Sequence, residues 1–368
     1  MDFTPSEAQD ELAGLARKIL AERDTPERQW ADLAAAGVLA AGLPEALGGA
    51  GLGLLEHCSV LAEIGRAVSD VPYLASIVLG AGAIAEFGSP SQRARWAVPA
   101  GQGAVVLTAA LAEEDGDDPR FPSASAVRRD GPRSRWVLSG VKTAVPAAPR
   151  ADLFLVPALT ADGVTVFLVE ASEVSVQPQR LTDFAEAGRV VLDGVTLDDD
   201  RVLGPGQGGQ VTDWLVSRGT VGLCALQAGV LERALELTAE YARNRVQFGR
   251  PIGSFQAVTQ RLADAYIDTE AVRLTMWQAA WLLASGGESD AAAGTAVAAA
   301  KFWAADAGHR VAHTAVHVHG GLGIDTSYPV HRYFVAAKHH EFALGGATAQ
   351  LRRIGADLAG GGLSGPGR

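Results

Sequence analysis

The C-terminal part of this 368-residue chain carries helical apolar spacing through four long segments that are joined by short connections. Such spacing is typical of amphipathic helices. The segments are residues 211–245, 254–285, 291–320 and 328–358. Four long helices with short connections predict an antiparallel bundle, because each helix must bury its apolar stripe against its neighbours. We therefore expect a C-terminal helical bundle over residues 206–360 and a disordered glycine-rich tail over 361–368.

The composition changes over residues 104–205, where short β-branched or aromatic runs alternate with Gly, Pro and Asp. The clearest runs are residues 135–138, 152–156, 164–169 and 189–192. Short runs of this kind between turn residues predict a small antiparallel β-domain. The acidic run at 113–119 (EEDGDDP) favours a solvated loop within it.

Residues 1–103 are rich in Ala and Leu with helical spacing, which predicts a domain of about five helices. The run Thr4-Pro5-Ser6-Glu7 has the form of a capping box with Pro at the first helical position, so the first helix should begin there. The fold class expected for the chain is therefore α+β and mostly α: a helical domain, a small antiparallel β-domain and a four-helix bundle.

Charge excludes some partners. The chain has 31 Lys and Arg against 42 Asp and Glu, a net charge of −11, which argues against nucleic acid and anionic membranes. A phosphate-bearing ligand is still compatible, because a few local arginines suffice to bind it. The sequence contains no run of about eighteen apolar residues without charges, so a transmembrane helix is not expected. The acidic N-terminus does not resemble a signal peptide, so the cytoplasm is the expected location.

No metal site is predicted. Cys58 and Cys224 lie far apart without a CxxC partner, and buried apolar roles suit them. His313, His317 and His319 alternate along one segment, a spacing that does not bring three ligands together on one helix face.

Two motifs carry the functional signal: YARNRVQFGRPIGSFQ at 241–256, and HVHGGLGIDTSYP at 317–329. Together with the helical, β, helical order, they resemble the acyl-CoA dehydrogenase family over nearly the whole chain. The resemblance implies an FAD-dependent enzyme that desaturates an acyl-CoA thioester. It also implies that FAD lies across a subunit interface, where the C-terminal domain of one subunit clamps the diphosphate and adenosine of a cofactor held by its neighbour.

The resemblance transfers the clamp residue by residue. Arg245 matches the arginine that pairs with the FAD diphosphate, a role suited to a forked guanidinium. His317 stands where the family usually has glutamine. The remaining matches are the polar, aromatic and glutamine contacts and the HGGxG turn, namely Gln247, Phe248, Gln256, Gly320, Gly321 and Gly323.

The catalytic base of the family has no counterpart here. Its glutamate usually lies six residues after a lysine, which in this chain is Lys338, and the residue at that place is Leu344. The backbone N–H of Leu344 is still suited to binding a thioester oxygen. Other members place the glutamate just before an arginine, here Arg218, and the residue at that place is Ser217. Leucine accepts no proton, and serine is a weak base without an activating group.

The β-domain departs from the family as well. The TEPxxGSD loop corresponds to residues 109–115, where little of it is retained. The element that covers the flavin ring corresponds to Ala144, Val145 and Pro146, which lack its aromatic face and hydroxyl. The flavin-ring half-site therefore looks eroded, whereas the adenosine half-site looks kept.

Asp213 and Glu341 are the candidate substitute bases. Asp213 lies one turn before Ser217 on the same helix face, although a solvated carboxylate near a helix start is the plainer interpretation. Glu341 follows His339 and His340, and three consecutive polar residues of a helix cannot all face one cleft.

The leading hypothesis is a subunit of a heteromeric acyl-CoA dehydrogenase, similar to actinobacterial members of the family. It would lend the FAD adenosine-diphosphate half-site to a homologous subunit that keeps the glutamate. One alternative is a self-sufficient homo-oligomeric flavoenzyme with a displaced base. Another is a non-catalytic structural subunit, or reuse of the fold without redox chemistry. The resemblance also implies an electron-transfer flavoprotein as electron acceptor.

Overall fold

The computed structural model describes residues 3–22, 25–114, 116, 118–129, 135–285 and 290–360. The predicted tail, 361–368, lies outside them. The chain divides into two compact units that interleave in sequence. One unit comprises Met1–Arg17, Cys58–Ser69 and Thr220–Arg368, and the other comprises Lys18–His57 and Asp70–Gly219. The predicted domain limits at 103 and 205 do not coincide with these divisions and stay predictions.

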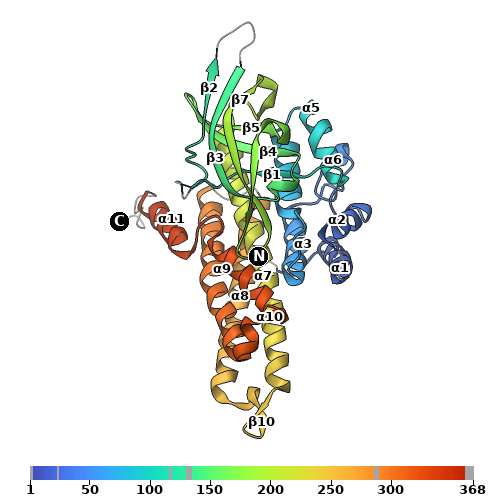
Figure 1. Ribbon diagram of the computed structural model, residues 1–368, viewed down its shortest axis with the longest axis vertical. Helices are drawn as coiled ribbons and strands as arrows, with labels where there is room; N and C mark the ends of the chain where they lie inside the picture. The colour runs from blue at the N-terminus through green and yellow to red at the C-terminus, as the bar shows by residue number, and fades with distance from the viewer. Residues whose placement is uncertain are drawn as a thin grey trace, which may run out of the picture. The chain divides into compact units, whose positions relative to one another are not determined.

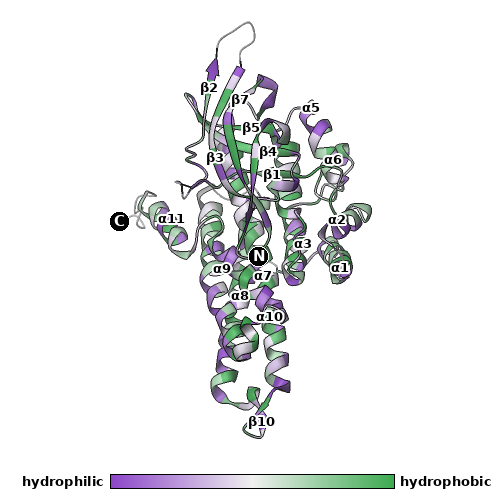
Figure 2. Cartoon of the chain, in the orientation of Figure 1, coloured by the Kyte–Doolittle hydropathy of each residue, from purple (hydrophilic) through white to green (hydrophobic). Residues whose placement is uncertain are grey.

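The C-terminal part is helical, as predicted (Figure 1). Its helices are α7 (Gly208–Asn244), α8 (Gln256–Ser285), α9 (Asp290–His319), α10 (Pro329–Phe342) and α11 (Ala347–Gly360). The first three match the predicted segments to within three residues. Apolar and polar residues alternate around these helices, as bundle packing requires (Figure 2). By length and composition α7 could cross a membrane, but 78% of its most apolar window is buried within the protein, as in a core helix.

The prediction of one helix over 328–358 was wrong, because the helix is broken after Phe342. Leu344 and Gly345 have φ angles of 54° and 93°, which no α-helix contains. The Gln350 amide donates to the carbonyl oxygens of both residues, at 3.1 and 3.2 Å, and so fixes the turn.

A buried lysine ends α10 before this turn. The Lys301 ammonium on α9 donates to the carbonyl oxygens of His340 and Glu341, at 2.7 and 3.1 Å. A cation at a helix C-terminus satisfies carbonyls that have no partner within the helix. Burial lowers the pKa of Lys301 to about 8. The helix end is therefore determined by a residue about forty positions earlier in the chain.

In the unit that contains Thr220–Arg368, the close contact between two helices depends on two glycines. Helix α3 (Leu54–Ala67) approaches α7 at Gly65 and Gly229. A Cβ atom on Gly229 would lie 1.9 Å from the Ala62 carbonyl oxygen, and one on Gly65 would lie 2.1 Å from that of Leu226. Arg66 of α3 forms ion pairs with Glu232 and Glu236 of α7, which strengthens this contact.

Apart from the single 3-10 turn Glu45–Leu47, the N-terminal part contains five helical stretches in its described residues, in agreement with the predicted number of about five. They are α1 (Glu7–Ala21), α2 (Pro26–Ala35), α3, and two stretches of mixed α- and π-helix that run through 73–87 and 90–101. The predicted position of the first cap was wrong. The Ser6 hydroxyl accepts from Gln9 N–H and the Gln9 side chain accepts from Ser6 N–H, so the reciprocal cap starts at Ser6.

The middle of the chain forms an eight-stranded sheet. The strands are β1 (Leu107–Ala109), β2 (Ser125–Arg129), β3 (Arg135–Pro146), β4 (Leu153–Thr160), β5 (Gly163–Glu170), β6 (Ser175–Arg180), β7 (Glu186–Leu197) and β8 (Val202–Leu203). Their order is β6-β7-β3-β2-β4-β5-β8, with β1 beside β4. The pairing is antiparallel as predicted, except that β1 and β2 both pair with β4 in parallel. Strand β4 is buried at every position but one, and its Phe154 packs with Phe167 of β5 in the core of the sheet.

Candidate functional site

A tight hairpin follows α7. Strands β9 (Val246–Gln247) and β10 (Arg250–Pro251) pair antiparallel across Phe248 and Gly249. Those two residues have φ angles of 53° and 77°, as a type I′ turn requires. This conformation suits glycine but is strained for phenylalanine. The Phe248 side chain is nevertheless 92% exposed, so no burial in the folded chain offsets the strain.

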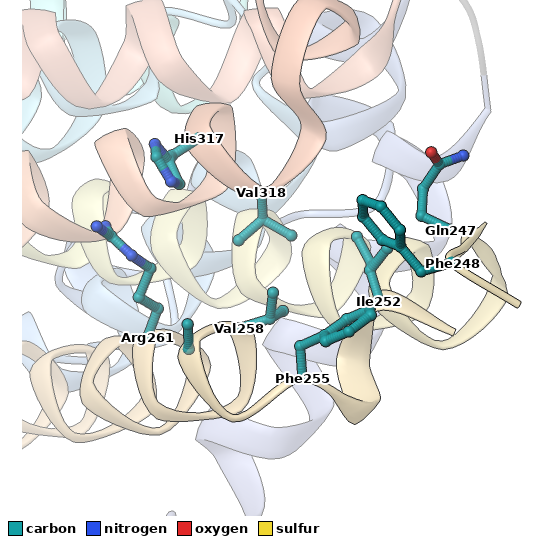
Figure 3. Close-up of a pocket in the computed structure, with 9 residues that line it drawn as sticks. Gln247, Phe248, Ile252, Phe255, Val258, Arg261, His317 and Val318 are labelled. Atoms are coloured by element: carbon teal, nitrogen blue, oxygen red, sulfur yellow. The ribbon is translucent and has the colours of Figure 1, made fainter. Parts of the chain in front are cut away.

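The hairpin borders a cavity of about 300 Å³ (Figure 3). That volume is at the low end of small-molecule sites, which span about 300–1,000 Å³. Figure 3 shows two chemically different ends. Phe248, Ile252 and Phe255 lie at one end, while His317 of α9 and Arg261 of α8 lie at the other. The remaining lining residues are Gln247, Ala257, Val258 and Val318.

The cavity brings together three of the predicted clamp residues, Gln247, Phe248 and His317. Arg245 and Gln256 do not line it. Arg245 lies at the end of α7, where its N–H donates to the Tyr241 carbonyl oxygen, and Gln256 is the first residue of α8. In sequence, Arg245 directly precedes the hairpin, and Gln256 follows it by a few residues.

Unpaired cations surround this hairpin although the chain is acidic overall. Within the described parts of the chain, Arg245, Arg250 and Arg261 form no ion pair with a carboxylate. The Arg250 guanidinium instead lies over the Phe255 ring, 4.2 Å from its centroid. Exposed arginines beside an aromatic cavity suit an anionic ligand that carries a planar ring.

The glycine turn after α9 lies next to the same region. Gly320 has a φ of 62°, and Cβ atoms on Gly320 and Gly321 would meet no atom within 4 Å, so their backbone faces open space. Gly323 has a different reason to be glycine, because a Cβ atom there would lie 2.8 Å from the Val316 backbone. Two of the predicted glycines are thus accessible to a ligand, and the third is required by packing.

A buried ring stack connects the two motifs. His319, immediately before the glycine turn, stacks on Tyr241 of α7 with centroids 4.4 Å apart. Its Nδ1 lies 2.8 Å from the Ala315 carbonyl oxygen, which assigns the ring proton to that nitrogen. Burial lowers the pKa of His319, so the ring is neutral at physiological pH. The ends of α7 and α9, and with them the hairpin and the glycine turn, are therefore joined.

No carboxylate occupies the positions that the resemblance assigns to the base. Leu344 lies in the turn between α10 and α11, and its N–H makes no hydrogen bond within the described chain. Ser217 lies in the first third of α7, beside Arg218. The Arg218 guanidinium lies 4.1 Å from the centroid of the Trp214 ring, and burial lowers the pKa of Arg218 to about 10.

The two substitute bases have different surroundings. The Asp213 side chain is 63% exposed and lies 4.0 Å from Arg120 Nε. The Glu341 carboxylate is 13% exposed, accepts from Lys338 Nζ at 2.5 Å and lies 3.2 Å from His309 Nδ1. The Glu341 carboxylate is thus engaged by Lys338 and His309, whereas the Asp213 carboxylate faces solvent.

The β-domain contains a buried ion pair that joins the two segments assigned to the flavin ring. The Lys142 ammonium of β3 lies 2.6 Å from the Glu113 carboxylate, and the two side chains are 0% and 6% exposed. Ser123 and Ala124 N–H groups donate to the same carboxylate. Burial favours a higher pKa for Glu113, but the hydrogen bonds from Lys142 and the backbone outweigh it and lower that pKa. The prediction of a solvated loop at 113–119 was wrong for Glu113, while Asp115 and Asp117 lie outside the described residues.

Further bonds hold the strand at the ring-covering position. Ala144 has a φ of 48°, and its N–H donates to the Gln179 side chain of β6 at 2.8 Å. The Pro146 carbonyl oxygen accepts from the Thr108 hydroxyl at 2.7 Å. These backbone groups are satisfied within the protein and are not free to bind a flavin ring.

The residues present therefore fit one half of an FAD molecule. The aromatic cavity, the unpaired arginines and the open glycine backbone suit adenosine and a diphosphate. At the ring side, the Glu113 carboxylate and the Ala144 N–H are already bonded within the protein.

Comparison with known proteins agrees with this fold. The acyl-CoA dehydrogenase N-terminal domain model matches residues 5–104, and the C-terminal domain model matches residues 206–359. The chain belongs to the acyl-CoA dehydrogenase family, whose members are FAD-dependent oxidoreductases acting on CH–CH bonds.

Its relatives come from actinobacteria among others. The acyl-CoA dehydrogenase FadE27 of Mycobacterium tuberculosis is 49% identical over 379 residues, which cover 98% of this chain and 99% of that protein. A chain of the ChsE4-ChsE5 complex from Mycobacterium tuberculosis superposes with a TM-score of 0.90 at 48% identity over the full length of both chains. A chain of the Tcur3481-Tcur3483 steroid ACAD has a TM-score of 0.89 at 40% identity, covering 97% of this chain and 99% of that one.

Sequence reasoning missed the Arg261 end of the cavity. Arg261 lies four and three residues after Ala257 and Val258, a spacing that places all three on one helix face. Because Gln256 already marked the start of that helix, the spacing was a usable signal for these lining residues.

Proposed function

We propose that this chain is one subunit of a heteromeric acyl-CoA dehydrogenase. It supplies the adenosine-diphosphate half-site for FAD to a homologous subunit that carries the catalytic glutamate and the flavin-ring contacts. The observation that carries the proposal is a contrast within one chain. The arginines in and near the clamp cavity have no ion-pair partner within the described chain, whereas the ring-side segments are joined by the buried Lys142–Glu113 pair.

The relatives support a two-component assembly. Two of the similar solved structures carry paired names, ChsE4-ChsE5 and Tcur3481-Tcur3483. The second is described as a steroid ACAD, so we propose an acyl-CoA thioester with a steroid-derived acyl group as the substrate class. The cytoplasm is the proposed location, and an electron-transfer flavoprotein is the proposed electron acceptor.

In this proposal the chain binds and orients but does not move the substrate proton. When bound, FAD supplies the acceptor for the hydride that leaves the β-carbon of the acyl group. Arg245 and the open backbone at Gly320 and Gly321 hold the diphosphate, while Phe248 packs against the adenosine and His317 lines the other end of the cavity. The carboxylate that takes the α-proton comes from the other subunit, because Leu344 and Ser217 cannot take it.

The test is to purify the chain alone and together with its candidate partner, the product of an adjacent acyl-CoA dehydrogenase gene. We expect stoichiometric flavin absorbance only in the co-purified complex, and bleaching of that absorbance by acyl-CoA. The variant Arg245→Met in the complex should lose most of the flavin. A chain that alone holds stoichiometric FAD and is reduced by acyl-CoA would exclude the heteromeric proposal. Absence of flavin from both preparations would exclude the family activity itself.

The self-sufficient enzyme with a displaced base is the second candidate. Its bases would be Asp213, which is exposed, or Glu341, which is bound by Lys338. Asp213→Asn and Glu341→Gln in the complex separate the two proposals. We expect each variant to keep kcat within about threefold of wild type, whereas removal of a true general base lowers it by about 100-fold or more.

A further inference from the structure

Arg261 is a cation in the clamp cavity that the two clamp motifs do not include. It lies on α8, one and a half turns after Gln256. Its side chain reaches the end of the cavity opposite Phe248 and Phe255, beside His317 of α9 (Figure 3). The same lining surface contains Ala257, Val258 and Val318, so Arg261 is the one permanently charged group among the lining residues.

The surroundings of Arg261 do not explain it as a surface ion pair. Asp264 lies three residues later, a spacing at which helical ion pairs commonly form, yet no contact joins the two within the described chain. Asp268, one turn further, accepts hydrogen bonds from Nε and Nη2 of Arg310, at 2.8 and 2.7 Å. The Arg261 guanidinium is thus left with its donors available toward the cavity.

The chemistry of the cavity indicates what those donors bind. A guanidinium donates five N–H bonds and accepts none, so its ligand must present acceptors, and anionic oxygens bind it best. Gln247, another polar residue of the lining, already donates to its neighbouring Val246 carbonyl oxygen. The opposite end offers the faces and edges of two phenyl rings, which suit a flat base. A ligand that is aromatic at one end and anionic at the other fits this polarity.

We propose that Arg261 is a second phosphate-binding cation for the adenosine-diphosphate part of the cofactor, in addition to Arg245. This inference rests on the proposed function, since it takes the clamp cavity to be the nucleotide site. Arg245 lies between the end of α7 and the hairpin, whereas Arg261 lies on α8 and lines the cavity itself. With the base against Phe248 and Phe255, the guanidinium of Arg261 meets the phosphate end of the ligand.

The test measures nucleotide affinity rather than turnover. The complex of this chain with its partner subunit is stripped of FAD and loaded with a fluorescent ADP analogue, which is then displaced by ADP or by adenosine. We expect Arg261→Met to weaken ADP about tenfold or more and adenosine by less than about threefold, because only ADP carries phosphate. Arg261→Lys should recover part of the ADP affinity. Arg243→Met, which removes an exposed arginine of α7 outside the cavity, should stay within about twofold of wild type.

The outcomes separate the inference from the proposed function. Unchanged ADP affinity in Arg261→Met, together with loss in Arg245→Met, would overturn the role of Arg261 and leave the clamp intact. An equal loss for ADP and adenosine would overturn the phosphate assignment. Failure of the wild-type complex to bind ADP or FAD at all would refute the proposed function, and the inference with it. Matching circular dichroism spectra confirm that each variant is folded.

Discussion

The strained turn at Phe248 predicts a mutation that stabilises the fold and weakens the site. A left-handed backbone costs a residue with a side chain about 1–2 kcal/mol, and Asn-Gly is a preferred pair for a type I′ turn. Phe248→Asn places that pair at 248–249, where φ is already 53° and 77°. Because the phenyl ring is 92% exposed, its removal sacrifices almost no burial within the chain. We therefore expect the hairpin to gain about 1 kcal/mol.

The same ring should matter for the ligand. Stacking of a base on an aromatic side chain contributes about 1–3 kcal/mol, so Phe248→Asn should weaken ADP binding by about fivefold or more. The variant should therefore be more stable but bind ADP more weakly. This combination is expected if the strained Phe248 is retained for ligand binding, and not if the strain has no role.

Hydrogen exchange is the appropriate stability assay, because a gain of 1 kcal/mol moves the melting temperature of a chain this long by only about 1–2 °C. The Ile252 amide bonds to the Arg245 carbonyl oxygen across the base of the hairpin and reports on its local opening. We expect its exchange to slow about fivefold. Phe121→Asn is the matched control, since Phe121 is 79% exposed and has no left-handed backbone. Faster exchange in Phe248→Asn, or unchanged ADP affinity, would refute the reasoning.

Three further predictions concern charge and the missing base. Burial lowers the pKa of His57 from 6.5 to about 4, so between these pH values the folded state binds fewer protons than the unfolded state. The protein should therefore lose up to about 3 kcal/mol of stability as the pH falls from 6.5 to 4. The melting temperature of His57→Asn should fall less steeply with decreasing pH than that of the wild type. Lys142→Met should destabilise the fold by about 3–5 kcal/mol in chemical denaturation because it leaves the Glu113 carboxylate buried without its ammonium, and adding Glu113→Gln should recover part of the loss. Leu344→Glu should not give the isolated chain acyl-CoA oxidation, because the ring side stays closed; flavin bleaching by acyl-CoA in that variant would contradict this.

The order of helical and β segments was readable from local patterns, since each element needs its own apolar period. The break in the last helix was not. Its position depends on the Lys301 ammonium and the Gln350 amide, which reach the helix end and the turn from α9 and α11. The helical apolar spacing continues through Leu344. A local pattern therefore does not reveal where a residue from elsewhere in the chain ends the helix.

Part of the cavity could be predicted because its residues are close in sequence. Gln247 and Phe248 lie in one hairpin, whereas Arg261 and His317 come from α8 and α9. The Glu113–Lys142 pair joins residues 29 positions apart on neighbouring segments of the β-domain. The local sequence of an acidic run does not show whether a distant strand supplies a buried counter-ion, so the run by itself predicts a solvated loop.

The interleaved division of the chain determines how it can be cut. A fragment that begins at residue 206 would contain the whole region matched by the C-terminal domain model, but it would lack α3. The surface of α7 at Gly229, which α3 covers, would then be exposed to water, and Glu232 and Glu236 would lose their ion pairs with Arg66. We expect such a fragment to aggregate, whereas a proteolytic nick after α3 should leave both pieces associated. The limits of the family models and of the compact units therefore differ in this protein, because Cys58–Ser69 falls in the same compact unit as Thr220–Arg368.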